Sequence, residues 1–206
     1  MTISITYSTG RLHTTAAPSE APDTSDAALI QSIAAGDKRA MRILFARHNV
    51  RVYRFLLRFV ADTSTAEDLV SEVFLDVWRQ AATFQARSQV STWLLAIARN
   101  KALAVLRRRT TEELDDERAA AIEDPGDNPE IMMENRQKTE ILRKCLTQLS
   151  PTHREVIDLV YYHEKSIDEV GEITGVPRNT VKTRMFYARK RIAELMTAQG
   201  TGRAML

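Results

Sequence analysis

The stretch SIDEVGEITGVPRNTVKTRMFYARKRIAEL, residues 166–195, decides the fold class of the chain. Ser166 followed three residues later by Glu169 is a capping-box pattern, which marks the start of a helix. Gly175 suits the left-handed position that ends this helix, and Pro177 can open the next one. The core side of that second helix would carry apolar residues at helical spacing: Val181, Met185, Ala188 and Ile192. The order of helix, short turn and helix predicts a helix-turn-helix, whose second helix can enter a DNA major groove.

The charge of the second helix supports this prediction. Over residues 177–191 the chain has six basic residues and no acidic one. A solvated basic face is the plain alternative. Asn179, Thr180 and Thr183 at the exposed start of the helix suit base edges, while the basic run 189–191 suits phosphates. Together these features favour DNA binding.

Helical spacing of apolar residues continues through the rest of the chain. One buried face is predicted from Met41, Leu44, Phe45, Val52, Phe55, Leu56 and Phe59. Thr63 or Ser64 can cap a helix over 66–79, and another helix is expected over 92–108. Ser150 and Pro151 open a further helix with a core side of Val156, Ile157, Leu159, Val160 and Tyr161. No alternating strand pattern or hairpin signal occurs, so the predicted fold is all-α.

Net charge divides the chain into two small helical domains. The formal net charge of +2 hides segments of +7 over 26–109, −9 over 110–135 and +5 over 136–206. The acidic segment 110–135 contains Pro and Gly and lacks aromatic residues, which is typical of a flexible linker. A charged helix over 112–122 is the alternative. Residues 1–25 are expected to be a disordered head and 197–206 a tail, leaving domains at 26–109 and 136–196.

The helix over 66–79 carries an acidic outer face. Asp68, Glu72, Leu75 and Arg79 line up at helical spacing, and Asp76 joins them. This face is either an ordinary solvated surface or a docking strip for a basic protein partner.

A second basic helix follows it. Arg99, Lys101 and the run 107–109 lie in a segment without acidic residues, and Trp93 stands near its start. Trp93 and Asn100 share one stripe with Arg107, so an aromatic platform beside cations could hold unstacked bases. The alternative is that Trp93 belongs to the core.

Composition excludes several classes of protein. The 206 residues are 44% hydrophobic and 27% charged, as in globular proteins, and no apolar run is long enough to span a membrane. The N-terminus lacks a secretory signal pattern, so a cytoplasmic protein is expected. Cys145, the single cysteine, excludes an internal disulfide and fits a small buried hydrophobe better than a reactive thiol. His13, His48, His153 and His163 lack metal-ligand spacing, and no nucleotide-binding or catalytic motif occurs. We therefore expect no cofactor, no metal and no enzymatic activity.

Three segments in order resemble the extracytoplasmic-function (ECF) group of bacterial RNA polymerase sigma factors, within the sigma-70 family. They are AEDLVSEVFLDVW, then STWLLAIARNKALAVLRRR, then LSPTHREVIDLVYYHEKSIDEVGEITGVPRNTVKTRMFYARKRI. The resemblance covers about residues 26–195. It implies a region 2 domain, a linker and a region 4 domain, in a subunit that directs core RNA polymerase to promoters.

The resemblance also implies site residues. Core polymerase would bind Asp68, Glu72, Leu75 and Asp76. The −10 promoter element would contact Gln85, Arg87, Ser88, Ser91, Trp93, Arg99, Asn100, Lys101, Arg107 and Arg108. The −35 element would contact Arg178, Asn179, Thr180, Lys182, Thr183, Arg184, Tyr187, Arg189 and Lys190. The implied partners are core RNA polymerase, promoter DNA and an anti-sigma factor, without membrane insertion.

Some residues depart from the pattern of this group. Gln85-Ala86-Arg87 replaces a frequent Arg-Gly-acidic run after Phe84, so the flipped −10 base is not predicted. Tyr187 stands where many members have a DNA-contacting Arg, and Gly171 replaces a frequent Ala.

Two other functions remain open from the sequence. An operator-binding regulator would use the helix-turn-helix but leave Trp93 and the acidic face without a role. A sigma-like decoy that titrates an anti-sigma factor would not need two separate basic surfaces.

Overall fold

The computed structural model describes residues 24–112 and 142–198, which contain helices and no strand. Most of the predicted head, acidic linker and tail, with most of the alternative helix 112–122, lies outside these residues. The helices are α1 (Asp26–Ala34), α2 (Lys38–Val60), α3 (Thr63–Gln80), α4 (Val90–Glu112), α6 (Pro151–Ile157), α7 (Ile167–Thr174) and α8 (Arg178–Ala198). A 3-10 turn (Ala81–Thr83) follows α3, a π-helical turn (Asp158–Tyr162) follows α6, and residues 142–147 are also helical. The all-α prediction is confirmed.

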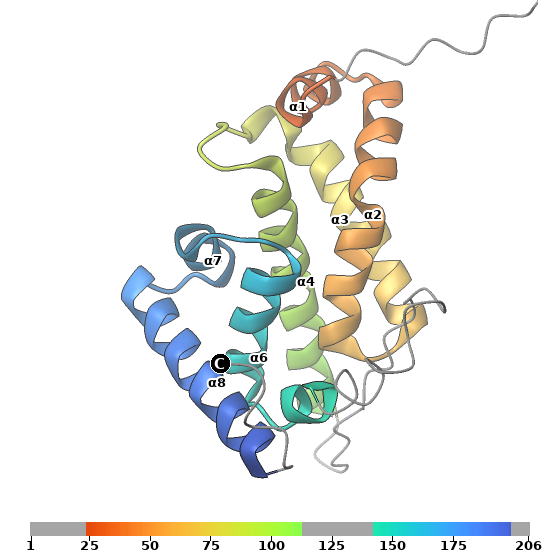
Figure 1. Ribbon diagram of the computed structural model, residues 1–206. Coiled ribbons are helices and arrows are strands. Elements are labelled where there is room, and N and C mark those ends of the chain that lie inside the picture. Colours follow the sequence, from red (N-terminus) through yellow and green to blue (C-terminus); the bar gives the residue numbers. More distant parts are fainter. Residues whose placement is uncertain (1–23, 113–141, 199–206) are drawn as a thin grey trace, which may run out of the picture.

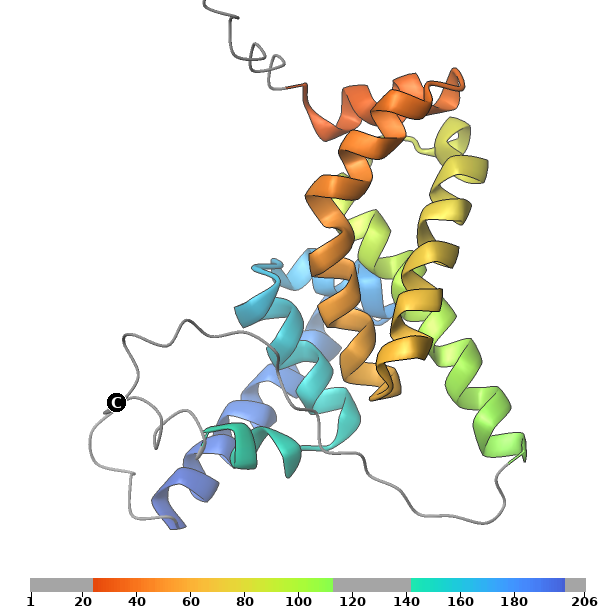
Figure 2. The same cartoon turned by 90° about the vertical axis from the view of Figure 1, so that its right-hand side faces the viewer.

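The chain forms two packed units. The N-terminal unit consists of α1 to α4, in which α2 and α3 run side by side and both pack on α4 (Figures 1 and 2). The C-terminal unit covers residues 142–198, in which α6, α7 and α8 pack together. The two units meet where α7 lies beside α4, while α8 forms the outer side of the C-terminal unit (Figure 1).

Local capping explains where the helices begin. Asp37 caps α2, since its carboxylate accepts from the amides of Arg39 and Ala40. Ser150 caps α6 with Pro151 in the first turn, as predicted. The cap of α3 is Asp62, so the prediction of Thr63 or Ser64 was wrong. The Asp62 carboxylate accepts from both the amide and the hydroxyl of Thr65, and these bonds lower its pKa.

Two residues predicted to be in the core lie outside it. Phe45 is 42% exposed because it sits at the rim, where its ring packs edge-on against Phe74 at 4.8 Å. Tyr161 is 61% exposed because it lies in the π-helical turn. There the amide of His163 donates to the carbonyl of Asp158, five residues back, and the wider turn rotates Tyr161 away from the core.

Candidate nucleic-acid interface

The helix-turn-helix has the predicted local geometry. Ser166 and Glu169 form a reciprocal capping box at the start of α7, and Gly175 ends α7 with φ +70°. The carbonyl of Gly171 accepts from the amides of both Gly175 and Val176. A Cβ at Gly171 would lie 3.1 Å from the Val176 carbonyl oxygen. Gly171 therefore permits a tight turn within this motif.

The outer face of α8 presents most of the residues predicted to read duplex DNA. The exposed ones are Arg178, Asn179, Lys182, Thr183, Tyr187, Arg189 and Lys190, whereas Thr180 and Arg184 are half-buried. Arg178 also pairs with Asp168 of α7 at 3.1 Å. Sequence reasoning missed Phe186, which is 61% exposed and packs edge-on against Tyr187 at 5.4 Å. The available signal was its spacing of four from Lys182.

An aromatic pair flanks the loop before α4. Phe84 packs on Trp93 with ring centroids 5.0 Å apart, and Trp93 is half-buried against the core. Gln85 and Arg87 on either side of Ala86 are exposed. Ala86 has φ +51°, the left-handed conformation that favours glycine. The loop thus displays polar side chains beside a partly open aromatic ring.

The acidic strip of α3, which consists of Asp68, Glu72, Leu75 and Asp76, contacts the basic helix α4 through Lys101. Lys101 lies 2.9 Å from Asp76 Oδ2 and 3.1 Å from Glu72 Oε2. Burial lowers the pKa of Lys101, but these two carboxylates outweigh it and raise the pKa above 10.5. Asp68 and Leu75 of the strip are exposed. The ammonium of Lys101, expected to contact DNA, is paired in this structure with two carboxylates that are expected to dock core polymerase.

The other α4 residues expected to contact DNA divide into exposed side chains and one that is held in an ion pair. Asn100, Arg107 and Arg108 are exposed. Arg99 is only 17% exposed and forms a two-pronged ion pair with Glu155 of α6, at 2.5 Å and 3.4 Å.

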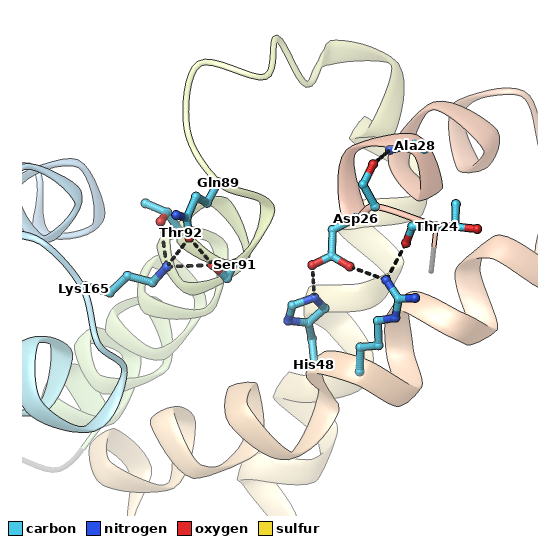
Figure 3. A network of polar contacts seen from close by, with 10 residues as sticks. Thr24, Asp26, Ala28, His48, Gln89, Ser91, Thr92 and Lys165 are labelled. Carbon is cyan, nitrogen blue, oxygen red and sulfur yellow. Dashed lines mark hydrogen bonds and ion pairs between the residues drawn. The ribbon is translucent and has the colours of Figure 1, made fainter. Parts of the chain in front are cut away.

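A buried lysine joins the two units. Lys165 of the C-terminal unit, with a side chain 3% exposed, donates to Ser91 Oγ at 2.6 Å and Thr92 Oγ1 at 3.0 Å. It also donates to Glu169 Oε1 at 3.0 Å, and the Thr92 hydroxyl donates to the same oxygen at 2.5 Å. Figure 3 shows Lys165 reaching across to Gln89, Ser91 and Thr92. Burial would raise the pKa of Glu169, but hydrogen bonds from Thr92, the Ser166 backbone and Lys165 lower it to about 2.

A second cluster lies further along the contact between the units. Arg58 of α2 pairs with the buried Asp158 at 2.7 Å and stacks over the ring of Tyr162 at 4.7 Å. Arg54 donates to the Tyr162 hydroxyl at 2.6 Å. His163 is buried edge-on against Phe55 at 5.3 Å. These contacts were not predicted, because the partners lie about a hundred residues apart in the sequence.

The remaining polar features belong to packing. Asp26 of α1 bonds His48 at 2.7 Å and Arg47 at 3.0 Å, which fixes α1 on α2 (Figure 3).

Cys145 is fully buried. Within residues 24–112 and 142–198, no group of three or more His, Cys, Asp or Glu residues could hold a metal ion. In the same residues no helix is both long and apolar enough to cross a membrane.

Comparison with known proteins gives the same division into two units. The family model described as Sigma-70 region 2 matches residues 44–112, and the model described as Sigma-70, region 4 matches residues 139–192. The ECF RNA polymerase sigma factor SigK of Mycobacterium tuberculosis (strain H37Rv) is 30% identical over 165 residues, covering 77% of this chain and 86% of SigK.

Solved structures share the fold. CnrH, solved in complex with the cytosolic domain of CnrY, aligns with a TM-score of 0.62 and 25% identity over 84% of this chain and 97% of CnrH. The sigma factor RpoE of Bartonella quintana, solved with the anti-sigma factor NepR, aligns with a TM-score of 0.60 and 24% identity over 76% of this chain and 96% of RpoE.

Proposed function

The chain belongs to the ECF RNA polymerase sigma factors, and we propose that its two units divide promoter recognition between them. As a sigma factor it binds core RNA polymerase, directs it to promoters through the −10 and −35 elements and helps to initiate transcription. The N-terminal unit would act as region 2, with the acidic strip on core polymerase and the loop before α4 on the −10 element. The C-terminal unit would act as region 4 and read the −35 element.

The outer face of α8 carries this proposal. It follows a capped helix and a left-handed glycine turn, and it exposes Asn179, Lys182 and Thr183 beside further cations. In a helix-turn-helix this face lies in the major groove, where amide and hydroxyl side chains contact base edges and cations contact phosphates.

Control by an anti-sigma factor is part of the proposal. Membership of the sigma factors supports it, and RpoE shows that a chain of this fold can be bound by such a partner. The chain would regulate transcription without a catalytic activity of its own, in the cytoplasm, where core polymerase and the chromosome are found.

Binding of the fluorescently labelled protein to purified core RNA polymerase tests the function. We expect one-to-one submicromolar binding, which charge reversal at the strip, Asp68→Arg with Glu72→Arg, should weaken. Asp68→Arg alone keeps the Lys101 ion pairs and should weaken binding to a smaller extent. Glu172→Arg, the same change at an exposed residue of α7, is the matched control. Failure of the folded wild type to bind would reject the sigma function in favour of an operator-binding regulator or a decoy.

A further inference from the structure

A polar hollow of about 400 Å³ lies between the start of α6 and the C-terminal half of α8. Its lining consists of Gln148, Ser150 and His153 on one side and Tyr187, Lys190, Arg191 and Glu194 on the other. One water molecule takes up about 30 Å³, so the hollow has room for a phosphate group together with several waters.

The charge of the lining favours an anion. Lys190 and Arg191 contribute two cations, against the single carboxylate of Glu194. Arg191 lies 3.3 Å from Glu194, but their side chains are 52% and 51% exposed, so this ion pair is weak. Within residues 24–112 and 142–198, no hydrogen bond or ion pair engages the ammonium of Lys190 or the ring of His153. The hollow therefore contains donors that the described part of the chain leaves without an acceptor.

The hollow adjoins the face of α8 that is expected to read DNA. Tyr187 and Lys190 belong both to the lining and to the residues expected to contact the −35 element. The other side of the hollow comes from the start of α6, which packs against α8 (Figure 2). When a reading helix lies in the major groove, side chains beside it contact the phosphates that border the groove. Lys, Arg, Gln, Ser and Tyr are all side chains that make such contacts.

We propose that this hollow binds a phosphate group, which is supplied by the backbone of the DNA that α8 reads. Lys190 and Arg191 provide the positive charge, and the ring of His153 and the hydroxyl of Tyr187 provide hydrogen bonds. A phosphate held between α6 and α8 fixes the orientation of α8 in the groove without reading a base. The inference rests on the proposed function only for the sequence of the DNA, because every duplex has backbone phosphates.

A pair of neighbouring variants tests the site. Gln148→Glu places a negative charge in the hollow, whereas Thr147→Glu places the same charge at the preceding exposed residue, outside the lining. Both wild-type side chains donate to the carbonyl of Lys144, at 3.3 Å and 2.9 Å, so the two variants lose the same local hydrogen bond.

A second pair tests the opposite change in charge. Glu194→Gln removes the carboxylate of the lining, and Glu67→Gln, at an exposed residue of α3, is its matched control. Circular dichroism checks that each full-length variant is folded. Fluorescence anisotropy then measures binding to a duplex of randomised sequence over a range of salt concentrations.

The two changes in the hollow should act in opposite directions. Gln148→Glu should weaken duplex binding about tenfold, because the new carboxylate takes the charged hydrogen bonds that a phosphate would accept. The slope of log K against log salt should also become shallower by about 0.9, the value for one phosphate contact. Glu194→Gln should tighten binding by about threefold, since Arg191 loses its competing partner. Each control should change the affinity by less than about twofold, because salt screens charges that do not adjoin the phosphate.

Calorimetric titration of the wild type with inorganic pyrophosphate identifies the source of the phosphate. We expect no binding at millimolar concentration, because the duplex contributes many contacts outside the hollow. Submillimolar binding that is abolished in Gln148→Glu would assign the hollow to a free phosphate anion and overturn the assignment to DNA.

Three further results would overturn the proposal: equal affinities of Gln148→Glu and Thr147→Glu for duplex DNA, an unchanged salt slope in Gln148→Glu, or a folded wild type that does not bind duplex DNA. None of these measurements uses polymerase. Failure of the wild type to bind core polymerase would therefore reject the sigma function and leave the hollow to be judged by duplex binding.

Discussion

Substitution of Lys101 by Met should lower the free energy of unfolding of the N-terminal unit rather than weaken its binding to DNA. The ammonium is 20% exposed and lies 2.9 Å from Asp76, whose side chain is 24% exposed. Loss of this largely shielded charged hydrogen bond costs about 1.5 kcal/mol. The more exposed pair with Glu72 contributes about 0.5 kcal/mol. Repulsion between Glu72 and Asp76, four residues apart on α3, then adds about 0.3 kcal/mol.

The expected sum is about 2 kcal/mol, which corresponds to a fall in Tm of roughly 4–8 °C. Urea unfolding followed by circular dichroism measures the free energy directly, and Lys101→Arg, which keeps the charge, should recover most of it. Because the pKa of Lys101 is raised above 10.5, its contribution should be complete below about pH 10.5 and disappear as the pH rises through the folded pKa.

The opposite pattern would refute this reasoning. Wild-type stability in Lys101→Met, together with weaker binding to single-stranded DNA, would show that the ammonium faces DNA and that its pairs with α3 contribute nothing.

Three further outcomes are expected. Ala86→Gly should change the free energy of unfolding by less than about 0.5 kcal/mol, because relief of the left-handed conformation offsets the extra entropy of the unfolded chain. The control Ala82→Gly should cost about 0.5–1 kcal/mol. Equal losses for the two variants in urea unfolding would contradict the φ of +51° at Ala86. The double variant Lys182→Ala with Arg184→Ala should lower transcription in vitro from a −35-dependent promoter by tenfold or more and leave core polymerase binding intact. Unchanged transcription would exclude α8 as the helix that reads the −35 element. Since the pKa of Glu169 is lowered from 4.5 to about 2, its contribution to the free energy of unfolding is complete above about pH 4.5 and lost as the pH falls toward 2. Urea unfolding over this range should show a smaller acid-induced loss of stability for Glu169→Gln than for wild type, and equal pH profiles would exclude this role.

The helix-turn-helix was predictable because each of its signals acts within a few residues. The Ser166 hydroxyl accepts from the Glu169 amide three residues on, and the Gly175 amide bonds the carbonyl of Gly171. Such patterns do not require knowledge of the rest of the chain. The cap of α3 marks the limit of this approach. Asp62 and the two residues that follow it, Thr63 and Ser64, are all good capping residues, and only the geometry of Thr65 selects Asp62.

The features that could not be predicted depend on contacts between residues far apart in the sequence. Arg99 and Lys101 have the same basic character as Arg107 and Arg108, so spacing and charge assign all of them to DNA. The structure separates them, because the partner of Arg99 is Glu155, 56 residues away, and that of Lys101 is on the preceding helix. The π-helical turn that exposes Tyr161 also has no local sequence signal.

The contact between the two units resolves a difficulty in the charge pattern. Segments with net charges of +7 and +5 should repel each other, yet the two units pack together. They do so because the C-terminal unit is polarised. Its carboxylates Glu155 and Asp158 face the N-terminal unit, while the cations of α8 lie on its outer side.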